Sequence, residues 1–303
     1  MQREYGRLNL NGTIMSKRDI RSLIEKGIVR GWDDPRLYTL KAIRRRGVPP
    51  RALLDLIYEL GVSTAMAFTD VKRFEQSIRR YLETTVPRLM MVLDPIPVII
   101  EDAEEQDLEV PFSPKDPEMG SRHIRLTKRV FIERSDFRET PSPGYFRLAP
   151  GEIVGLMRIP HPIRAVSSEK DESTGAIKEI RAVYEKDGGR KPRAYIHWVP
   201  EGSPKAEVRL HGALFKSDQP GLVPGGFMRD LAPESETIWP EAMIEHAIRE
   251  VRSRAPWPKT AADQTDNIGP ECTRFQALRV AYFVSEILPP LIVAVLTCYM
   301  VGA

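Results

Sequence analysis

The chain has 303 residues, with 45 Lys and Arg, 42 Asp and Glu, and a formal net charge of +3. At roughly 100 to 200 residues per domain this length predicts two or three domains, and a composition of 42% hydrophobic and 29% charged residues is typical of a folded soluble protein. Two cysteines exclude a disulfide framework, and no basic-then-apolar leader opens the chain, so we expect a reducing, cytoplasmic compartment.

The positive charge is concentrated in the first part of the chain. Residues 1–80 hold 17 Lys and Arg against 9 Asp and Glu, a net +8, whereas the remaining 223 residues hold 28 against 33, a net −5. Such a division indicates a basic module that faces a polyanion and is joined to a more neutral one. A solvated basic helical surface without a ligand is the alternative.

The first elements in chain order are predicted to be helices. Between Asp19 and about Leu82, apolar residues recur at three-and-four spacing and glycines or prolines end each run. We expect Asp19 to be the N-cap of the first helix and Gly27 to end it. The four helical stretches are "DIRSLIEKG", "GWDDPRLYTLKAIRRRG", "PPRALLDLIYELG" and "DVKRFEQSIRRYLE".

Two basic groups of this region are candidate phosphate ligands. Ser16 and Lys17 follow a glycine-bearing loop and precede a helix, where a lysine and backbone N–H groups suit a polyphosphate. Lys41, Arg44 and Arg45 are spaced to share one helical face beside Arg46, which would suit the backbone of an RNA stem. An ordinary helix cap and a hydrated surface are the respective alternatives.

From about Pro87 onward the pattern changes to short β-branched runs broken by Pro, Gly and Asp. Several short strands joined by turn-rich loops favour barrels or sandwiches, and about 200 residues exceed one small barrel. We therefore predict an α+β multidomain fold, in which a small helical bundle precedes two mostly antiparallel β-barrels divided near Gly188 and Gly189. Arg88 lies at the junction, where it could read a splayed base or form an inter-domain salt bridge.

Metal and membrane sites receive little support from the sequence. The five histidines have no metal-ligand spacing and no cysteine partner, so we predict no protein-bound metal. The apolar end, residues 287–303, spans 17 residues, fewer than the ~20 that a helix needs to cross a bilayer. A membrane anchor is therefore not favoured.

A set of motifs distributed along the chain resembles the cytosolic glutaminyl-tRNA synthetases, a family of class I aminoacyl-tRNA synthetases, in their fungal form. The resemblance runs in order from about residue 2 to about residue 284. It implies ATP-dependent attachment of glutamine to its tRNA, with Mg²⁺ and ATP as cofactors of the complete enzyme. The motifs are "RLNLNGTIMSKR", "GWDDPRLYTLKAIRRRG", "PRLMMVLDPIPVIIED", "DPEMGSR", "FIERSDFRE", "GYFRLAPGEIVGLMR" and "YIHWVPEGS".

The resemblance implies roles for residues near the start of the chain. Arg7 and Leu8 match positions that contact ATP. Met15, Ser16 and Lys17 match the signature loop, whose lysine steadies the ATP phosphates and is the implied catalytic residue.

In the β region the resemblance implies contacts with the anticodon of glutamine tRNA. Arg88, Arg147 and Arg158 match arginines that hold anticodon bases. Thr64 and Gly144 stand where bacterial relatives place a lysine and a glutamine on the anticodon.

The two ends depart from the family pattern. We expect the Rossmann half with the glutamine pocket to be missing, and we interpret the apolar tail as the product of a truncated or misassembled gene model. The predicted division is 1–87 for the end of the catalytic domain with the helical module, 88–189 and 190–286 for two anticodon-binding barrels, and 287–303 for the aberrant tail. A non-enzymatic tRNA-binding module is the main alternative, and a glutamyl-tRNA synthetase or a tail-anchored protein are the others; further protein partners stay open.

Overall fold

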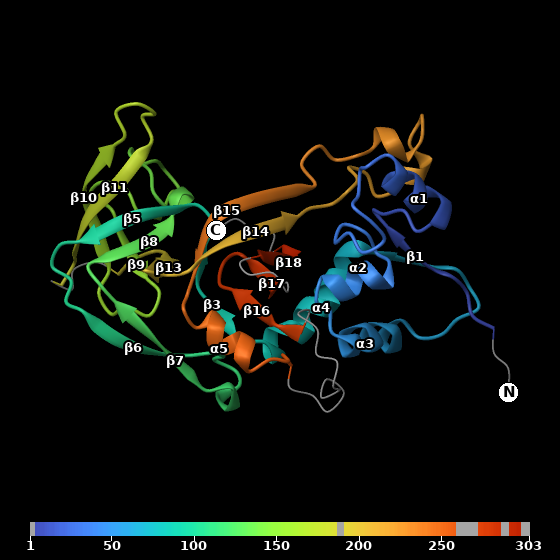
Figure 1. Cartoon of the computed structure of the whole chain (residues 1–303), viewed down its shortest axis with the longest axis horizontal. Coiled ribbons are helices and arrows are strands. Elements are labelled where there is room, and N and C mark those ends of the chain that lie inside the picture. The colour runs from blue at the N-terminus through green and yellow to red at the C-terminus, as the bar shows by residue number, and fades with distance from the viewer. Residues whose placement is uncertain (1–3, 187–190, 259–271, 286–290, 298–303) are drawn as a thin grey trace.

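The computed structural model describes residues 4–186, 191–258, 272–285 and 291–297. Helices gather at one end of an elongated molecule, and two β-sheets follow one another toward the other end (Figure 1). The mixture of α and β structure agrees with the predicted class. The first part of the chain contributes β1 (Leu8–Asn11), α1 (Lys17–Glu25), α2 (Leu40–Arg45), α3 (Pro50–Leu60), β2 (Ala67–Asp70) and α4 (Val71–Thr85), with β1 and β2 paired in parallel.

Local sequence explains where these helices begin. Thr39 and Asp70 cap α2 and α4 by accepting backbone N–H hydrogen bonds at 3.0 and 2.7 Å, and Pro50 occupies the first turn of α3. The expected N-cap of α1 was wrong: Ser16, which has an extended backbone, is the N-cap, and Asp19 lies inside the first turn. The carboxylate of Asp19 still favours that turn, because it faces the positive end of the helix dipole.

The first large sheet has seven strands and nearly closes on itself. Its order is β12-β9-β10-β11-β5-β8-β13, and the two end strands, β12 and β13, are separated only by His197. One short stretch of chain therefore pairs with both β9 and β8. The strands are β5 (Pro95–Ile100), β8 (Arg129–Glu133), β9 (Ile153–Leu156), β10 (Ile163–Lys170), β11 (Ile177–Tyr184), β12 (Tyr195–Ile196) and β13 (Trp198–Pro200).

The second large sheet is closed by the same device. Its order is β3-β16-β17-β18-β14-β15-β4, and its end strands, β3 and β4, are separated only by Met90. The strands are β3 (Arg88–Leu89), β4 (Met91–Val92), β14 (Lys205–His211), β15 (Glu236–Ile244), β16 (Arg274–Ala277), β17 (Ala281–Ser285) and β18 (Leu291–Thr297). A separate antiparallel hairpin, β6 (Gln106–Pro111) with β7 (Ser121–Leu126), and the short helix α5 (Ile248–Ser253) complete the elements.

Part of the apolar tail is a strand of this second sheet. Leu291–Thr297 forms β18, which pairs antiparallel with β17 and parallel with β14. The other residues of 287–303 lie outside the described ones. Across the described residues, we find no helix that is both long and apolar enough to span a membrane.

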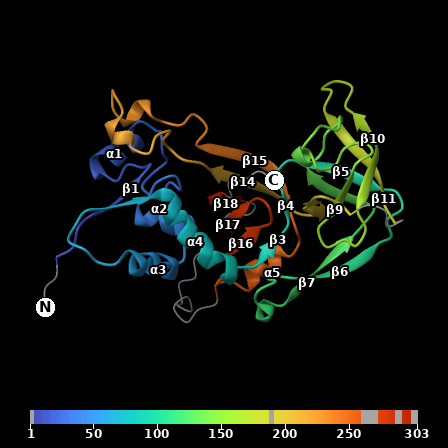
Figure 2. The same cartoon turned by 180° about the vertical axis from the view of Figure 1, so that it is seen from behind.

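The buried apolar residues form separate cores. One is centred on the first sheet, includes Trp198 and Ile96, and extends to the β6–β7 hairpin. Another is shared, because Phe74, Ile78 and Leu82 of α4 pack with residues of the second sheet. The helical module and the second sheet therefore form one packed unit, which agrees with their adjacency in both cartoon views (Figure 1, Figure 2).

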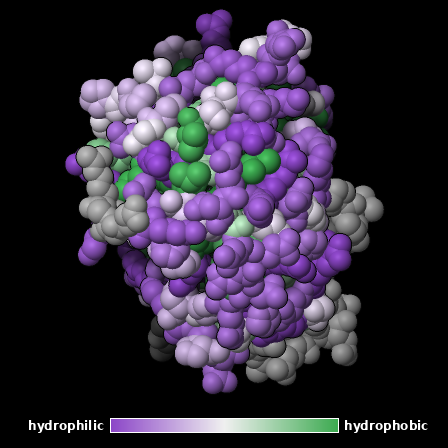
Figure 3. Space-filling view, turned by 90° about the vertical axis from the view of Figure 1, so that its left-hand side faces the viewer, coloured by the Kyte–Doolittle hydropathy of each residue, from purple (hydrophilic) through white to green (hydrophobic). Residues whose placement is uncertain are grey.

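The free end of the first sheet is mainly polar. Seen from the side that carries β10 and β11, the surface is mostly hydrophilic, with small separate apolar areas in the upper half of the view (Figure 3). The face shown there lacks the broad apolar area expected of an obligate protein interface.

Candidate nucleic-acid interface

The loop between β1 and α1 holds the predicted phosphate-binding residues. Gly12, at φ 81°, turns the chain, and its N–H donates to the Asp218 carbonyl at 2.6 Å. The Met15 sulfur accepts a hydrogen bond from the Leu10 N–H at 3.4 Å. Ser16 makes no side-chain cap hydrogen bond. The loop is thus anchored at its base while its helix-capping hydroxyl is uncommitted.

The charged members of this group face solvent. Lys17 is the first residue of α1 and is exposed, and Arg7 is exposed just before β1. Leu8 is half-buried in β1. Strand, loop and helix therefore bring all five predicted ATP ligands into one local unit, with its two cations on the surface.

The "WDDPR" motif has a structural use that its sequence did not reveal. Asp34 is buried and accepts hydrogen bonds from Arg36 Nε and Nη2 at 2.9 and 2.8 Å, while Arg36 Nη1 donates to the Ser235 hydroxyl at 2.9 Å. Burial by itself would raise the pKa of Asp34, but these hydrogen bonds outweigh it and lower the pKa to about 2. The motif therefore ties the helical module to the start of β15.

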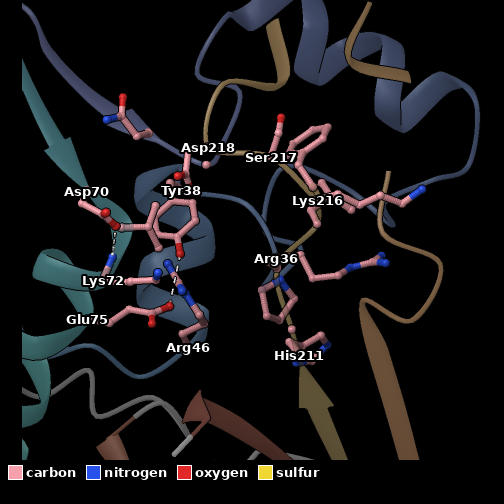
Figure 4. Close-up of a pocket in the computed structure, with 18 residues that line it drawn as sticks. Arg36, Tyr38, Arg46, Asp70, Lys72, Glu75, His211, Lys216, Ser217 and Asp218 are labelled. Carbon is pink, nitrogen blue, oxygen red and sulfur yellow. Dashed lines mark hydrogen bonds between the residues drawn. The ribbon is translucent and has the colours of Figure 1, made fainter. Parts of the chain in front are cut away.

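A pocket of about 240 Å³ lies where the helices meet the loop after β14 (Figure 4). Tyr38 donates to Glu75 Oε1 at 3.3 Å, and burial raises the pKa of Tyr38 to about 12. The Arg46 guanidinium lies 4.5 Å from the centre of the Tyr38 ring. The prediction that places Arg46 beside an RNA-facing basic surface was wrong, because this side chain is buried against an aromatic ring.

The rest of that basic face is at the surface. Lys41 and Arg44 are exposed, and Arg45 forms a salt bridge with Asp33 at 3.2 Å. The helical spacing thus brings these three cations near one face, and Arg45 is paired with an acidic residue of the turn that precedes α2.

A second pocket, of about 490 Å³, lies between the two large sheets. Its apolar lining comes from Leu210, Trp239 and Val280 of the second sheet and from Leu93, which connects β4 to β5. Polar and charged side chains also line it, and they include Arg147, Arg279, Asp136, Glu133 and His197. An apolar lining with a few convergent polar groups is typical of a small-ligand site.

Asp136 binds two of the arginines that line this inter-sheet pocket. Its carboxylate is 1% exposed and accepts both terminal nitrogens of Arg279, at 2.6 and 2.9 Å. Arg147 Nη1 lies 3.1 Å from the same carboxylate. The predicted Arg147 therefore lines a pocket, and Arg279, with φ 64° in the turn between β16 and β17, was missed by sequence reasoning.

Arg88 lies in β3 directly opposite Gln276 of β16. Arg88 Nε and Gln276 Oε1 are both buried and have no hydrogen-bond partner among the described residues. Side chains at paired positions of neighbouring strands project from the same face of a sheet. An unpaired donor and an unpaired acceptor thus stand side by side, and sequence reasoning singled out only the arginine.

The remaining predicted contacts lie elsewhere. Arg158 is exposed in the turn after β9 with φ 69°, and Thr64 is exposed in the loop before β2. Neither lines the inter-sheet pocket. Within the part of the chain that the structure describes, no group of three or more His, Cys, Asp or Glu side chains could hold a metal ion.

Three family models match the chain and cover most of it. Residues 1–84 match the catalytic domain of the class I tRNA synthetases (E and Q), and residues 86–185 and 195–256 match anti-codon binding domains of the same group. The order of the matches follows the order of the helical module and the two sheets. The chain belongs to the class I tRNA synthetases of the E and Q group.

Within this group the chain is similar to glutamine–tRNA ligases. It is 68% identical over 283 residues to the glutamine–tRNA ligase protein virJ of Hypocrea virens, covering 93% of this chain and 44% of that protein. It is 48% identical to a probable glutamine–tRNA ligase of Schizosaccharomyces pombe and 44% identical to the glutamine–tRNA ligase of Saccharomyces cerevisiae, covering 93% of this chain and 36% and 37% of theirs. The chain therefore spans less than half the length of these relatives.

Proposed function

We propose that this chain is the tRNA-binding portion of a glutamine–tRNA ligase, an enzyme that activates glutamine with ATP and transfers it to glutamine tRNA. The similarity to three fungal ligases supports the reaction and the substrates. A cytoplasmic site of action and the three-part division at residues 87 and 189 belong to the same proposal. In it the helical module holds the tRNA stem, and the two sheets act as anticodon-binding barrels.

The inter-sheet pocket is the observation that carries the proposed role in anticodon binding. Its apolar walls, with Trp239 among them, suit the faces of an unstacked base, and Arg147 and Arg279 supply N–H donors for the base edge. Sequence-specific proteins read RNA mainly through such splayed bases. Arg158 and Thr64 would contact the anticodon loop from outside this pocket.

Arg88 and Gln276 supply a second base-reading pair in this proposal. A donor beside an acceptor matches a base edge that offers both an acceptor and an N–H donor, and one good bidentate contact discriminates by about 1–3 kcal/mol. A buried donor or acceptor without a hydrogen-bond partner is unfavourable in the free protein. A ligand that forms hydrogen bonds with both atoms therefore gains binding free energy.

The signature loop carries the proposed role in ATP binding. Ser16 and Lys17 at the N-terminus of α1 have the donors that phosphate oxygens require, and Arg7 and Leu8 lie at the adjoining strand. Met15 shapes the loop through its contact with Leu10. Bound Mg²⁺ would supply further charge neutralisation on the phosphates, and Lys17 would stabilise the charge that develops during adenylate formation.

One experiment tests the tRNA-binding role. We expect the purified 303-residue chain to bind glutamine tRNA with a steep salt dependence, because cationic side chains release counterions from phosphates. The Arg88→Ala variant should bind the cognate transcript more weakly by about 1–3 kcal/mol. Its affinity for anticodon-substituted transcripts should be almost that of the wild type. Equal affinity of wild type and Arg88→Ala for the cognate transcript would refute the role of Arg88.

A second candidate function is a non-enzymatic tRNA-binding module. The match to the catalytic domain is confined to residues 1–84, which favours it as an account of the isolated chain. We expect no glutamine-dependent exchange between ATP and pyrophosphate from this chain alone. Measurable exchange would show that the chain is catalytically sufficient and would exclude this second candidate.

Lys17 is tested in a longer enzyme. When the chain is fused to the preceding half of the Hypocrea virens relative, Lys17→Ala should lower the adenylation rate by about 10²-fold while leaving tRNA affinity unchanged. The neighbouring exposed Arg18→Ala is the matched control. Equal loss of adenylation and of tRNA binding would mean that the loop is structural.

A further inference from the structure

Asp136 holds two arginines that come from different sheets. It ends the short helical turn 134–136 after β8 of the first sheet, whereas Arg279 belongs to the turn between two strands of the second sheet. Arg147 comes from the loop that follows Asp136 in the chain. A single carboxylate therefore connects the two sides of the inter-sheet pocket.

Opposite charges stabilise the contact between Asp136 and the two arginines. The guanidinium groups of Arg147 and Arg279 contact the same carboxylate and repel each other, and Asp136 compensates one of the two positive charges. The bidentate contact with Arg279 also fixes the plane of that guanidinium. His197 adds a third contact, since its Nδ1 lies 3.1 Å from Arg279 Nη1.

Both arginines keep donors for a ligand. Each guanidinium has five N–H groups, and the contacts with Asp136 use two of those of Arg279 and one of Arg147. The two side chains are 21% and 26% exposed, and both line the pocket. The ion pairs with Asp136 therefore fix both side chains while N–H groups of each stay available to a ligand.

We propose that Asp136 is a positioning residue for anticodon discrimination, and that it makes Arg147 and Arg279 act as one recognition unit. This proposal rests on the proposed binding of the anticodon in the inter-sheet pocket. A base or phosphate that engages one arginine meets a guanidinium whose orientation depends on the carboxylate shared with the other. Recognition by the two arginines is consequently coupled.

A purely structural role for Asp136 makes a different prediction. If the carboxylate only joined the sheets, its loss would lower stability and would weaken cognate and substituted tRNAs equally. A positioning role instead predicts loss of the preference for the cognate anticodon.

The experiment measures binding of the 303-residue chain to a glutamine tRNA transcript and to transcripts with one anticodon base replaced. Discrimination is the ratio of the substituted to the cognate Kd. The isosteric Asp136→Asn should lower this ratio about tenfold at the positions that Arg147→Ala and Arg279→Ala affect, with Kd for substituted transcripts changed by less than about threefold. The control is Asp171→Asn in the turn between β10 and β11, where the carboxylate accepts the Ser173 and Thr174 N–H groups at 3.0 and 2.9 Å and does not line the pocket. This variant should keep the wild-type discrimination ratio.

A double-mutant cycle gives a second, independent readout. With Asp136 intact, Arg147→Ala and Arg279→Ala together should lose less discrimination than the product of the single losses, by about threefold or more. In the Asp136→Asn background the two losses should become multiplicative. If Asp136→Asn does not fold, as judged by its thermal melt, the cycle in the wild-type background decides the question.

The outcomes separate the two proposals. Wild-type discrimination in Asp136→Asn, or independent losses in the cycle, would overturn the positioning role while leaving anticodon binding intact. Unchanged discrimination in both arginine variants would overturn the proposed pocket itself.

Discussion

The two large sheets are closed alike but are supported differently. Each has seven strands, and each is completed by a short stretch of chain that pairs with both ends, residues 195–200 in the first sheet and 88–92 in the second. The core of the first sheet extends to the β6–β7 hairpin and to Val92 and Met243 of the second sheet, whereas the second sheet shares its main core with α4. Each sheet is therefore closed by one short segment that is interrupted by a single residue. Whether a sheet can be stable without its neighbours depends on which elements pack against it.

The contact expected to matter most is the buried ion pair that joins the β6–β7 hairpin to the residue after β15 of the second sheet. Arg122 Nε and Nη2 donate to Glu245 at 2.5 and 2.9 Å, and Glu245 also accepts from the Met90 N–H at 2.6 Å, at the point where β3 and β4 meet. Glu245→Ala leaves Arg122 buried without its partner, so we expect a loss of about 3–5 kcal/mol in urea unfolding.

Glu241 provides the matched control for this prediction. Its pair with Lys205 is about two-thirds exposed, so Glu241→Ala should cost less than about 1 kcal/mol. Similar losses for the two variants would show that the closing strand does not depend on Glu245.

Substitution of two buried isoleucines tests the difference between the cores of the two sheets. Ile78 of α4 and Ile96 of β5 are both fully buried, one in each core, and truncation of either to Ala should cost about 2–5 kcal/mol. Hydrogen exchange should then rise in α4 and the second sheet together for Ile78→Ala, and in the first sheet alone for Ile96→Ala. A global rise in exchange for both variants would mean that the two cores unfold as one.

We expect His211, at the end of β14 in the second sheet, to make the stability of the protein sensitive to acid. Burial lowers the pKa of His211 to about 4, even though Glu236 lies 3.0 Å from it and opposes that shift. Since the unfolded value is near 6.5, the unfolded state binds the proton first as the pH falls. Stability should therefore drop between pH 6.5 and 4, by on the order of 2 kcal/mol, and the drop due to Asp34 should follow only below pH 4.

Urea unfolding at steps between pH 7 and 4 measures this slope. His211→Gln should reduce it, whereas replacement of the exposed His246 by Gln should leave it unchanged. An unchanged slope in His211→Gln would assign the acid sensitivity to other groups.

The smallest expected effect concerns a helix cap in the module that supports the second sheet. Thr39 accepts the Ala42 N–H at 3.0 Å, so Thr39→Ala should cost about 1 kcal/mol in urea unfolding. The same replacement at the exposed Thr64 should cost nearly nothing. Equal costs at the two positions would argue against a capping role for Thr39.

The sequence by itself indicated the four helices between Asp19 and about Leu82, because apolar spacing and Pro or Gly punctuation act within a few residues. It missed β2, which lies between α3 and α4. The motif matches identified the family for the same reason, since a motif is a local pattern. These signals also located the signature loop before α1 and the change from helices to strands near Pro87.

Only the tertiary structure decided which charged residues are exposed, which line a pocket and which are buried. Arg46 has the spacing of a surface cation but packs on Tyr38, and Asp34 looks like a turn residue but is buried. Arg279 and Asp136 are 143 residues apart in sequence and bond across two sheets. Burial and partners depend on contacts between distant segments, and the pairing of β18 with β14 is another such contact that no local pattern encodes.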